Sequence, residues 1–190
     1  MGFEAVKKST IALWVVLAAG VVVVSAGALA LSGAHPLAIW NVSGSMPEGL
    51  YLRTSAGTLR DGDVVAVCLS DVAHRHIEVM ALARHYVGPD RLGACSYRGQ
   101  RFAPLVKRIV AVPGQDVVIG RRGIFVNGHL QAQSVPLKAD SAGRALPQIS
   151  FSGRLAAGTY VVMGENPLSY DSRYFGPIPR SDVLERLWKP

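Results

Sequence analysis

Three short stretches of the chain carry hydroxyl, amine and carboxylate side chains that could form one reactive site. The first is residues 41–51 (NVSGSMPEGLY), in which small residues before Ser45 leave room for a substrate chain. A serine hydroxyl is a weak nucleophile at neutral pH, so Ser45 needs a neighbouring base and donors for the developing oxyanion. Such a motif is also common in plain loops, so its interpretation depends on partners elsewhere in the chain.

The second stretch, residues 104–113 (PLVKRIVAVP), contains Lys107. Strand alternation places Lys107 on one face with Leu105, Ile109 and Ala111. Burial there disfavours the ammonium and lowers a lysine pKa from roughly 10.4 toward 7 or 8, where the amine can act as a general base. The alternative is a lysine at a sheet edge, with its ammonium in solvent.

The third stretch, residues 164–176 (GENPLSYDSRYFG), is rich in residues that favour loops. It places Asp171 and Arg173 two positions apart, and we interpret them as an ion pair that fixes the shape of the loop. Ser169 either caps a turn or orients Lys107.

The chain that positions these residues has 190 residues, of which 49% are hydrophobic. This length allows one membrane segment and one domain with a real core. The net charge is +7 and the pI is near 9.8, but the basic residues are spread along the chain. Aromatic and basic residues do not alternate as they do on nucleic-acid surfaces. We therefore expect no nucleic-acid partner, and an anionic lipid surface as the partner of the basic domain.

Residues 11–31 are uncharged and span about 32 Å as a helix, which matches the hydrocarbon thickness of a bilayer. We predict a cytoplasmic N-terminus and transmembrane anchor over residues 1–32, followed by a domain over residues 33–190. Lys7 and Lys8 precede the apolar run, so the positive-inside rule places the domain outside the cytoplasm. In a bacterium it would lie in the periplasm, on a single-pass protein of the inner membrane. A cleaved signal peptide is the alternative.

The rest of the chain reads as mainly β. Apolar, largely β-branched runs predict antiparallel strands, and glycine-rich turns and an Asn-Gly pair separate some of them. The strands are expected near residues 64–69, 105–112, 117–119, 124–126 and 159–163. Helical spacing over residues 72–86 predicts a small helical insertion at about 70–100. Residues 131–157 lack clear periodicity and are expected to form a long excursion.

Cys68 and Cys95 bracket this insertion. They could be buried thiols, a metal pair or a disulfide. Neither a Cys-x-x-Cys spacing nor clustered histidines indicate a metal, and a location outside the cytoplasm favours oxidation. We therefore expect a disulfide, worth roughly 3 to 4 kcal/mol by chain entropy, and neither metal nor cofactor.

Together the three stretches resemble the type I signal peptidases, membrane-anchored serine proteases of mainly antiparallel β fold with a Ser-Lys dyad. The resemblance implies that Ser45 is the nucleophile and Lys107 the general base. Ser43 and the Ser45 N–H would form the oxyanion hole. Ser169 would hydrogen-bond the lysine, and Asp171 and Arg173 would hold the site in shape.

The short Ser-Met-Pro-x-Gly-Leu-Tyr box, the lone anchor and the insertion resemble the conjugative-transfer (TraF-type) branch of that family. The resemblance implies a precursor protein as substrate, here a pilin precursor, and an acyl-enzyme released by water or by an amine of the same substrate. Two turns depart from the family pattern, because Asp116 is displaced by one position and Glu165 stands where aspartate is common.

Other interpretations remain open at this point. The chain could be a general signal peptidase for secretory preproteins or a non-catalytic, anchored assembly protein of a secretion or pilus channel. A Ser-His-Asp hydrolase would need one of the five histidines as its base, and none has a convincing setting. These are His35, His74, His76, His85 and His129. A self-cleaving repressor shares the Ser-Lys chemistry but should carry a DNA-binding module where this chain has an apolar run.

Overall fold

The computed structural model describes residues 14–15, 17–21, 38–55, 57–69, 86, 95–97 and 100–190. The chain divides into two compact units, residues 1–36 and residues 37–190. In the first unit, the described residues are helical. Within the described ranges, no helix is both long and apolar enough to cross a bilayer. Most of the predicted anchor, residues 11–31, lies outside the described residues and stays a prediction.

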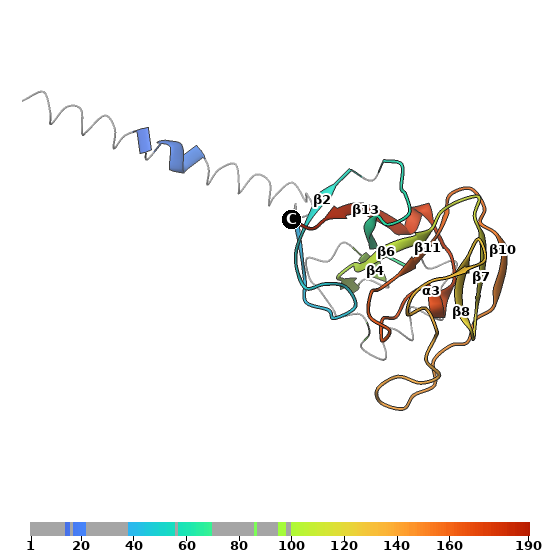
Figure 1. Ribbon diagram of the computed structural model, residues 1–190. Helices are drawn as coiled ribbons and strands as arrows, with labels where there is room; N and C mark the ends of the chain where they lie inside the picture. The colour runs from blue at the N-terminus through green and yellow to red at the C-terminus, as the bar shows by residue number, and fades with distance from the viewer. Residues whose placement is uncertain are drawn as a thin grey trace, which may run out of the picture. The chain divides into compact units, whose positions relative to one another are not determined.

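A seven-stranded antiparallel sheet forms the body of the second unit (Figure 1). Its strands, in spatial order, are β1 (Ala38–Asn41), β2 (Gly49–Thr54), β13 (Val183–Trp188), β3 (Val64–Val67), β6 (Leu105–Ala111), β11 (Thr159–Met163) and β12 (Ile178–Pro179). Strand β6 pairs with β3 on one side and β11 on the other. The predicted strands at 64–69, 105–112 and 159–163 are confirmed, and Lys107 lies on a central strand.

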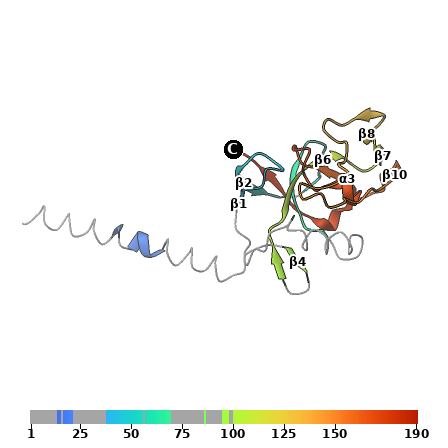
Figure 2. The ribbon, with the colours of Figure 1, turned by 90° about the horizontal axis from the view of Figure 1, so that it is seen from below.

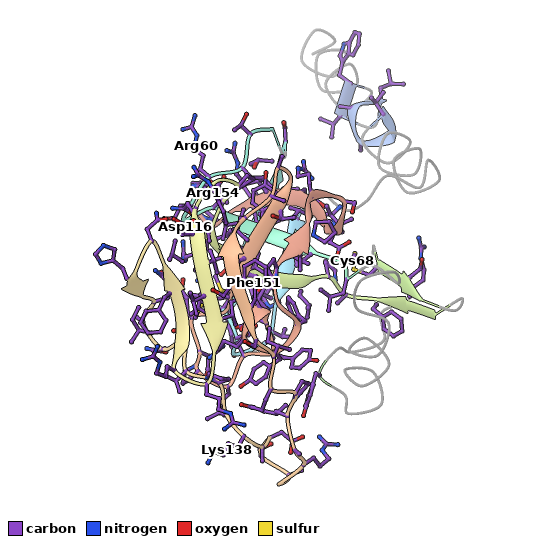
Figure 3. All side chains as sticks on the ribbon, turned by 90° about the vertical axis from the view of Figure 1, so that its right-hand side faces the viewer. Arg60, Cys68, Asp116, Lys138, Phe151 and Arg154 are labelled. Carbon is purple, nitrogen blue, oxygen red and sulfur yellow. A yellow bond between two sulfur atoms is a disulfide. The ribbon has the colours of Figure 1, made fainter. Side chains whose placement is uncertain are left out.

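A second, four-stranded sheet has the order β10 (Phe151–Arg154), β7 (Asp116–Gly120), β8 (Gly123–Val126) and β9 (His129–Leu130). Asn127 and Gly128 both have positive φ, as the predicted Asn-Gly hairpin requires. Within the excursion predicted at 131–157, strand β10 pairs with β7 so that Arg154 lies opposite Asp116, and both are labelled in Figure 3.

The predicted helical insertion is wrong at its C-terminal end. Strands β4 (Cys95–Tyr97) and β5 (Gln100–Phe102) form an antiparallel hairpin. Figure 2 shows this hairpin extending away from the larger sheets. The reason is local, since the antiparallel pairing of residues 95–97 with residues 100–102 overrides the helical pattern found further upstream. The helix predicted over residues 72–86 lies outside the described residues except for Tyr86.

The expected disulfide is present. Cys68, just after β3, is bonded to Cys95 at the start of β4. Figure 3 shows Cys68 where the β4–β5 hairpin meets the body of the unit. The bond therefore ties the end of the insertion to a strand that pairs directly with β6.

Three apolar clusters hold the second unit together. One packs the short helix α3 (Ser172–Phe175) against the seven-stranded sheet and includes Val65, Ile109 and Tyr174. Another joins the two large sheets, with Ala111 and Ile124 among its members. The last lies on the opposite face of β6, and it consists of Met46, Tyr51, Ala66, Val106 and Leu187. Because β6 contributes to all three clusters, its position is strongly constrained.

Candidate active site

Ser45 lies in the loop that connects β1 to β2, where Asn41 pairs with Gly49 to close the hairpin. The neighbouring Met46 side chain is buried in a core cluster and so holds one side of the loop in place. The Tyr51 hydroxyl donates to the main-chain oxygen of Pro47 at 2.8 Å. Ser45 itself is half-buried. The loop thus has a fixed shape while its central hydroxyl stays accessible.

Lys107 reaches the Ser45 hydroxyl from β6. Its Nζ donates to the Ser45 Oγ at 3.1 Å, and the lysine is 2% exposed. Burial disfavours the ammonium and lowers the pKa of Lys107 to about 8, while the Asp171 carboxylate opposes this and the Arg173 guanidinium adds to it. The sequence left open whether Lys107 is buried or lies at a sheet edge. The structure shows it buried, because it lies opposite Val65 on a central strand.

Ser43 lies on the other side of Ser45. Its Oγ is 3.0 Å from the Ser45 Oγ, and its side chain is exposed. If Ser45 is the nucleophile, a hydroxyl this close to it could donate to an oxyanion formed on the attacked carbonyl. The row of three polar groups, Lys107, Ser45 and Ser43, comes from two separate elements of the chain.

Asn41 was not singled out from the sequence, yet it makes more contacts in this loop than any predicted residue. Its Nδ2 donates to the main-chain oxygens of Ser43, Met46 and Pro47 at 3.1, 3.0 and 3.3 Å. Its Oδ1 accepts from the N–H and the hydroxyl of Ser43 at 3.2 and 2.8 Å. Asparagine two residues before a polar turn residue is a common turn former, which is the one local signal available.

The third stretch folds into a loop fixed from within by Asp171 and Arg173. Their side chains are fully buried and joined at 2.6 Å. Arg173 also donates to four main-chain oxygens, those of Gln133, Asn166, Pro167 and Ser169. Asp171 accepts from the Gly164 N–H at 2.8 Å and caps α3. The predicted ion pair is therefore present, and it determines the shape of residues 164–173.

This third loop also contacts the loop that carries Ser45. Asn166 donates through its side chain to the Gly44 oxygen at 3.0 Å and through its N–H to the Ser45 oxygen at 3.3 Å. A Cβ on Gly164 would lie 2.7 Å from the Ser45 oxygen and 2.2 Å from the Ser169 Oγ. Glycine at 164 is therefore needed for the two loops to approach, which the sequence did not reveal.

Ser169 is buried, and among the described residues its hydroxyl has no hydrogen-bond partner. It lines the same cavity as Lys107, but the structure does not show the hydrogen bond to Lys107 expected from the sequence. A buried hydroxyl without a partner costs free energy. Ser169 is thus an unused donor and acceptor on the same cavity as the candidate base.

Ser45 lies at the junction of two hollows. The larger, a cavity of about 530 Å³, extends past Lys107 and Ser169 to Tyr86 and is lined mostly by apolar side chains. The smaller, about 470 Å³, is open and is bounded by residues 44–48 and 165–167. An extended peptide could therefore place its scissile carbonyl at Ser45 with chain on either side.

His129 is the one histidine within the described part of the chain. His129 is exposed on β9, in the four-stranded sheet, and the other four histidines lie outside the described residues. Within the described ranges, no group of three or more metal-ligating side chains occurs. The described side-chain partners of the Ser45 hydroxyl are Lys107 and Ser43.

Comparison with known proteins shows the family of the chain. The model of the family "Signal peptidase, peptidase S26" matches residues 9–188. The chain belongs to this family. It is 36% identical over 167 residues to conjugal transfer protein TraF of Agrobacterium fabrum strain C58, covering 87% of each chain. It is 24% identical over 156 residues to signal peptidase I V of Bacillus subtilis strain 168, covering 76% of this chain and 93% of that protein.

Among solved structures, a signal peptidase I from Enterococcus faecalis aligns with a TM-score of 0.36 at 20% identity, covering 70% of this chain and all of that one. Membership of the signal peptidase family rests on the sequence matches. Because of this family membership, the contacts between Ser45, Lys107 and Ser43 are best compared with those expected of a serine peptidase.

Proposed function

We propose that this signal peptidase family member is a Ser-Lys endopeptidase that cleaves a membrane-borne precursor protein, specifically a conjugative pilin precursor. The observation that carries the proposal is the 3.1 Å contact between the Lys107 Nζ and the Ser45 Oγ at a buried lysine. The similarity to a conjugal transfer protein supports the choice of substrate.

In the proposed reaction, neutral Lys107 accepts the proton of the Ser45 hydroxyl as its oxygen attacks the scissile carbonyl. The Ser43 hydroxyl and the Ser45 N–H donate to the oxyanion. Protonated Lys107 then gives its proton to the leaving amine, the C–N bond breaks, and an acyl-enzyme remains on Ser45. Water, or an amine of the same substrate, attacks the ester and frees the serine.

The surrounding residues take supporting roles in this proposal. Ser169 offers its unpartnered hydroxyl to the Lys107 amine and so helps to orient it. Asp171 and Arg173 hold the loop that presents Ser169. Burial supplies the remaining requirement, because it brings the pKa of Lys107 within reach of neutral pH.

The pH dependence of cleavage is a direct prediction of this role. Because the pKa of Lys107 lies at about 8, only about a tenth of the enzyme carries the neutral amine at pH 7. We expect kcat/KM to rise by about tenfold per pH unit below 8 and to level off above it. The measurement is kcat/KM from pH 6 to pH 10. A midpoint near 6.5 would indicate a histidine base, and a midpoint above 10 would indicate an exposed lysine.

The substrate is tested by presenting the full-length enzyme with a conjugative pilin precursor and with an ordinary secretory preprotein, then weighing the products by mass spectrometry. We expect cleavage of the pilin alone. A product one water lighter than the hydrolysed form would reveal acyl transfer to an internal amine. Comparable cleavage of the preprotein would instead favour a general signal peptidase, which the similarity to signal peptidase I V supports. No cleavage of either would favour a non-catalytic assembly protein.

We also propose that the protein is held at the periplasmic face of the inner membrane and that lipid covers part of the catalytic unit. Two cross-strand pairs, Trp40 with Leu50 and Leu52 with Trp188, lie on one face of the sheet. Trp40 is 68% exposed and Trp188 is 56% exposed. Tryptophan is enriched at membrane interfaces, and β1 begins only seven residues after the apolar run 11–31 ends.

Fluorescence quenching tests this lipid contact in the reconstituted full-length chain. With Trp14 replaced by phenylalanine, we expect brominated lipids to quench most of the emission of Trp40 and Trp188. The matched control carries Leu130→Trp, on the exposed face of β9, in place of all three native tryptophans, and should be quenched little. Equal quenching of both proteins, or none of either, would contradict the proposed surface.

A further inference from the structure

Asn41 is a buried residue that contacts the Ser43 hydroxyl at one end of the candidate site. It ends β1 and is 6% exposed, and the side-chain hydrogen bonds that the described residues give it all go to the loop that carries Ser43 and Ser45. We infer that Asn41 is a positioning residue that holds the Ser43 hydroxyl in the resting enzyme and releases it only when the oxyanion forms. This inference rests on the proposed Ser-Lys mechanism.

The contacts determine which way the amide of Asn41 points. Its Nδ2 faces three main-chain oxygens at 3.0 to 3.3 Å, and its Oδ1 faces the N–H and hydroxyl of Ser43. A flipped amide would place its oxygen against those three oxygens and its N–H₂ against the Ser43 N–H. That arrangement keeps only a donation from the N–H₂ to the Ser43 hydroxyl and loses the other four bonds, so the Oδ1 must be the acceptor beside Ser43.

This orientation settles the direction of the neighbouring hydrogen bonds. The Oδ1 of Asn41 can only accept, so the Ser43 hydroxyl, at 2.8 Å, donates its one proton to it. In the 3.0 Å contact between the two serines, Ser43 must then accept and Ser45 must donate. Lys107 donates to the Ser45 Oγ from the other side. The resting site is thus a row of donations from Lys107 through Ser45 and Ser43 to Asn41.

Catalysis requires this row to be rearranged. The proton of Ser45 must turn toward neutral Lys107, and the proton of Ser43 must leave Asn41 to reach the oxyanion. A hydrogen bond to a charged acceptor is roughly twice as strong as one to a neutral acceptor. The Ser43 hydroxyl therefore donates to the oxyanion instead of to the Asn41 Oδ1. When the carbonyl of a bound substrate is still uncharged, the hydroxyl keeps its hydrogen bond to Asn41. The Ser43 contact is consequently made in the transition state and not in the ground state, which raises kcat without lowering KM.

The test is a double-mutant cycle between Asn41 and Ser43 in the full-length enzyme, with pilin precursor cleavage as the readout. Removing one oxyanion donor costs about 10²- to 10³-fold in kcat, which is the expected effect of Ser43→Ala. We expect Asn41→Ala to lower kcat by roughly 10- to 100-fold with little change in KM, because the Ser43 hydroxyl is no longer aimed. In the Ser43→Ala background, Asn41→Ala should cost less than about threefold.

One control separates this role from simple support of the loop, and one replacement variant keeps the test possible if Asn41→Ala does not fold. Tyr51→Phe removes the other side-chain bond to the Pro47 oxygen without touching Ser43, and it should leave kcat within about threefold of wild type. If Asn41→Ala does not fold, as judged by its melting temperature, Asn41→Ser carries the cycle. In this variant, the hydroxyl of the introduced serine can still accept from the Ser43 N–H, as in a turn, but the serine side chain is shorter than that of asparagine.

The outcomes distinguish this inference from the proposed function. If the losses in kcat of the two single variants multiply fully in the double variant, the role of Asn41 is overturned. The same holds if Asn41→Ala has the kcat of wild type. Full activity of Ser45→Ala would overturn the Ser-Lys mechanism itself. Non-additive losses in kcat, with unchanged KM and an unaffected Tyr51→Phe enzyme, would support the inference.

Discussion

Replacing Lys107 by methionine is expected to reduce precursor cleavage to background while the protein stays folded. Methionine matches the length of the lysine stem and fills the same buried space between β3 and β11, so the core should tolerate it. The variant lacks the only described amine in contact with the Ser45 Oγ. Loss of a general base costs typically 10²- to 10⁴-fold, and here the same group would also protonate the leaving amine.

Ser45→Ala should be as inactive as Lys107→Met, since the two groups act as one unit in the proposed mechanism, and the double variant should be no worse than either. Arg108→Met is the matched control, because Arg108 is the next residue on β6 and pairs with Glu165 at the surface. It should retain activity close to that of wild type. Cleavage by purified Lys107→Met above a trace would refute the dyad, and alanine replacement of each histidine would then be the next step.

The candidate site could be predicted from the sequence to the extent that it depends on local pattern. Strand alternation assigned Lys107 to a face with Ile109, and the structure buries both. Alternation does not tell whether a strand is central or at an edge, because that depends on its partners. Val65 and Met163, which belong to the flanking strands, are far from β6 in sequence. The sequence therefore left the environment of Lys107 open.

Residues that act between loops were missed for the same reason. Asn166 bonds to the Gly44 oxygen, 122 positions away, and Gly164 matters only because Ser45 and Ser169 approach it. Neither residue carries reactive chemistry, so nothing in its own stretch marks it. Asn41 differs in that its contacts are local, and a search for turn-forming asparagines beside the candidate nucleophile Ser45 would have found it.

Parts of the fold were missed where the period of two breaks down. Strand β13 (VLERLW) lies between β2 and β3, yet a register shift between Val183 and Glu185 disrupts its alternation. Strands β4 and β5 have only three residues each, too few for a periodic signal. The longer runs, such as those of β6 and β11, were predicted because several β-branched residues follow one another there.

Replacing Arg173 by methionine is expected to cause the largest loss of stability of any single change in the third loop. The variant leaves the Asp171 carboxylate buried without its counter-ion and removes the donor from four main-chain oxygens. Breaking a buried pair by removing one partner costs about 3 to 5 kcal/mol. For a domain of this size that corresponds to a melting temperature lower by roughly 6 to 20 °C. Calorimetry of the purified protein measures it.

The double variant Asp171→Asn/Arg173→Met tests whether the unpaired charge is the cause. Asparagine keeps a neutral acceptor for the Gly164 N–H, so we expect the double variant to melt at a higher temperature than Arg173→Met alone. Arg108→Met, which breaks the exposed pair with Glu165, should cost at most about 1 kcal/mol. A double variant less stable than Arg173→Met would mean that the lost main-chain bonds, rather than the buried carboxylate, dominate. Because this loop carries Ser169, which lines the same cavity as Lys107, cleavage by Arg173→Met should fall even at temperatures where the protein remains folded.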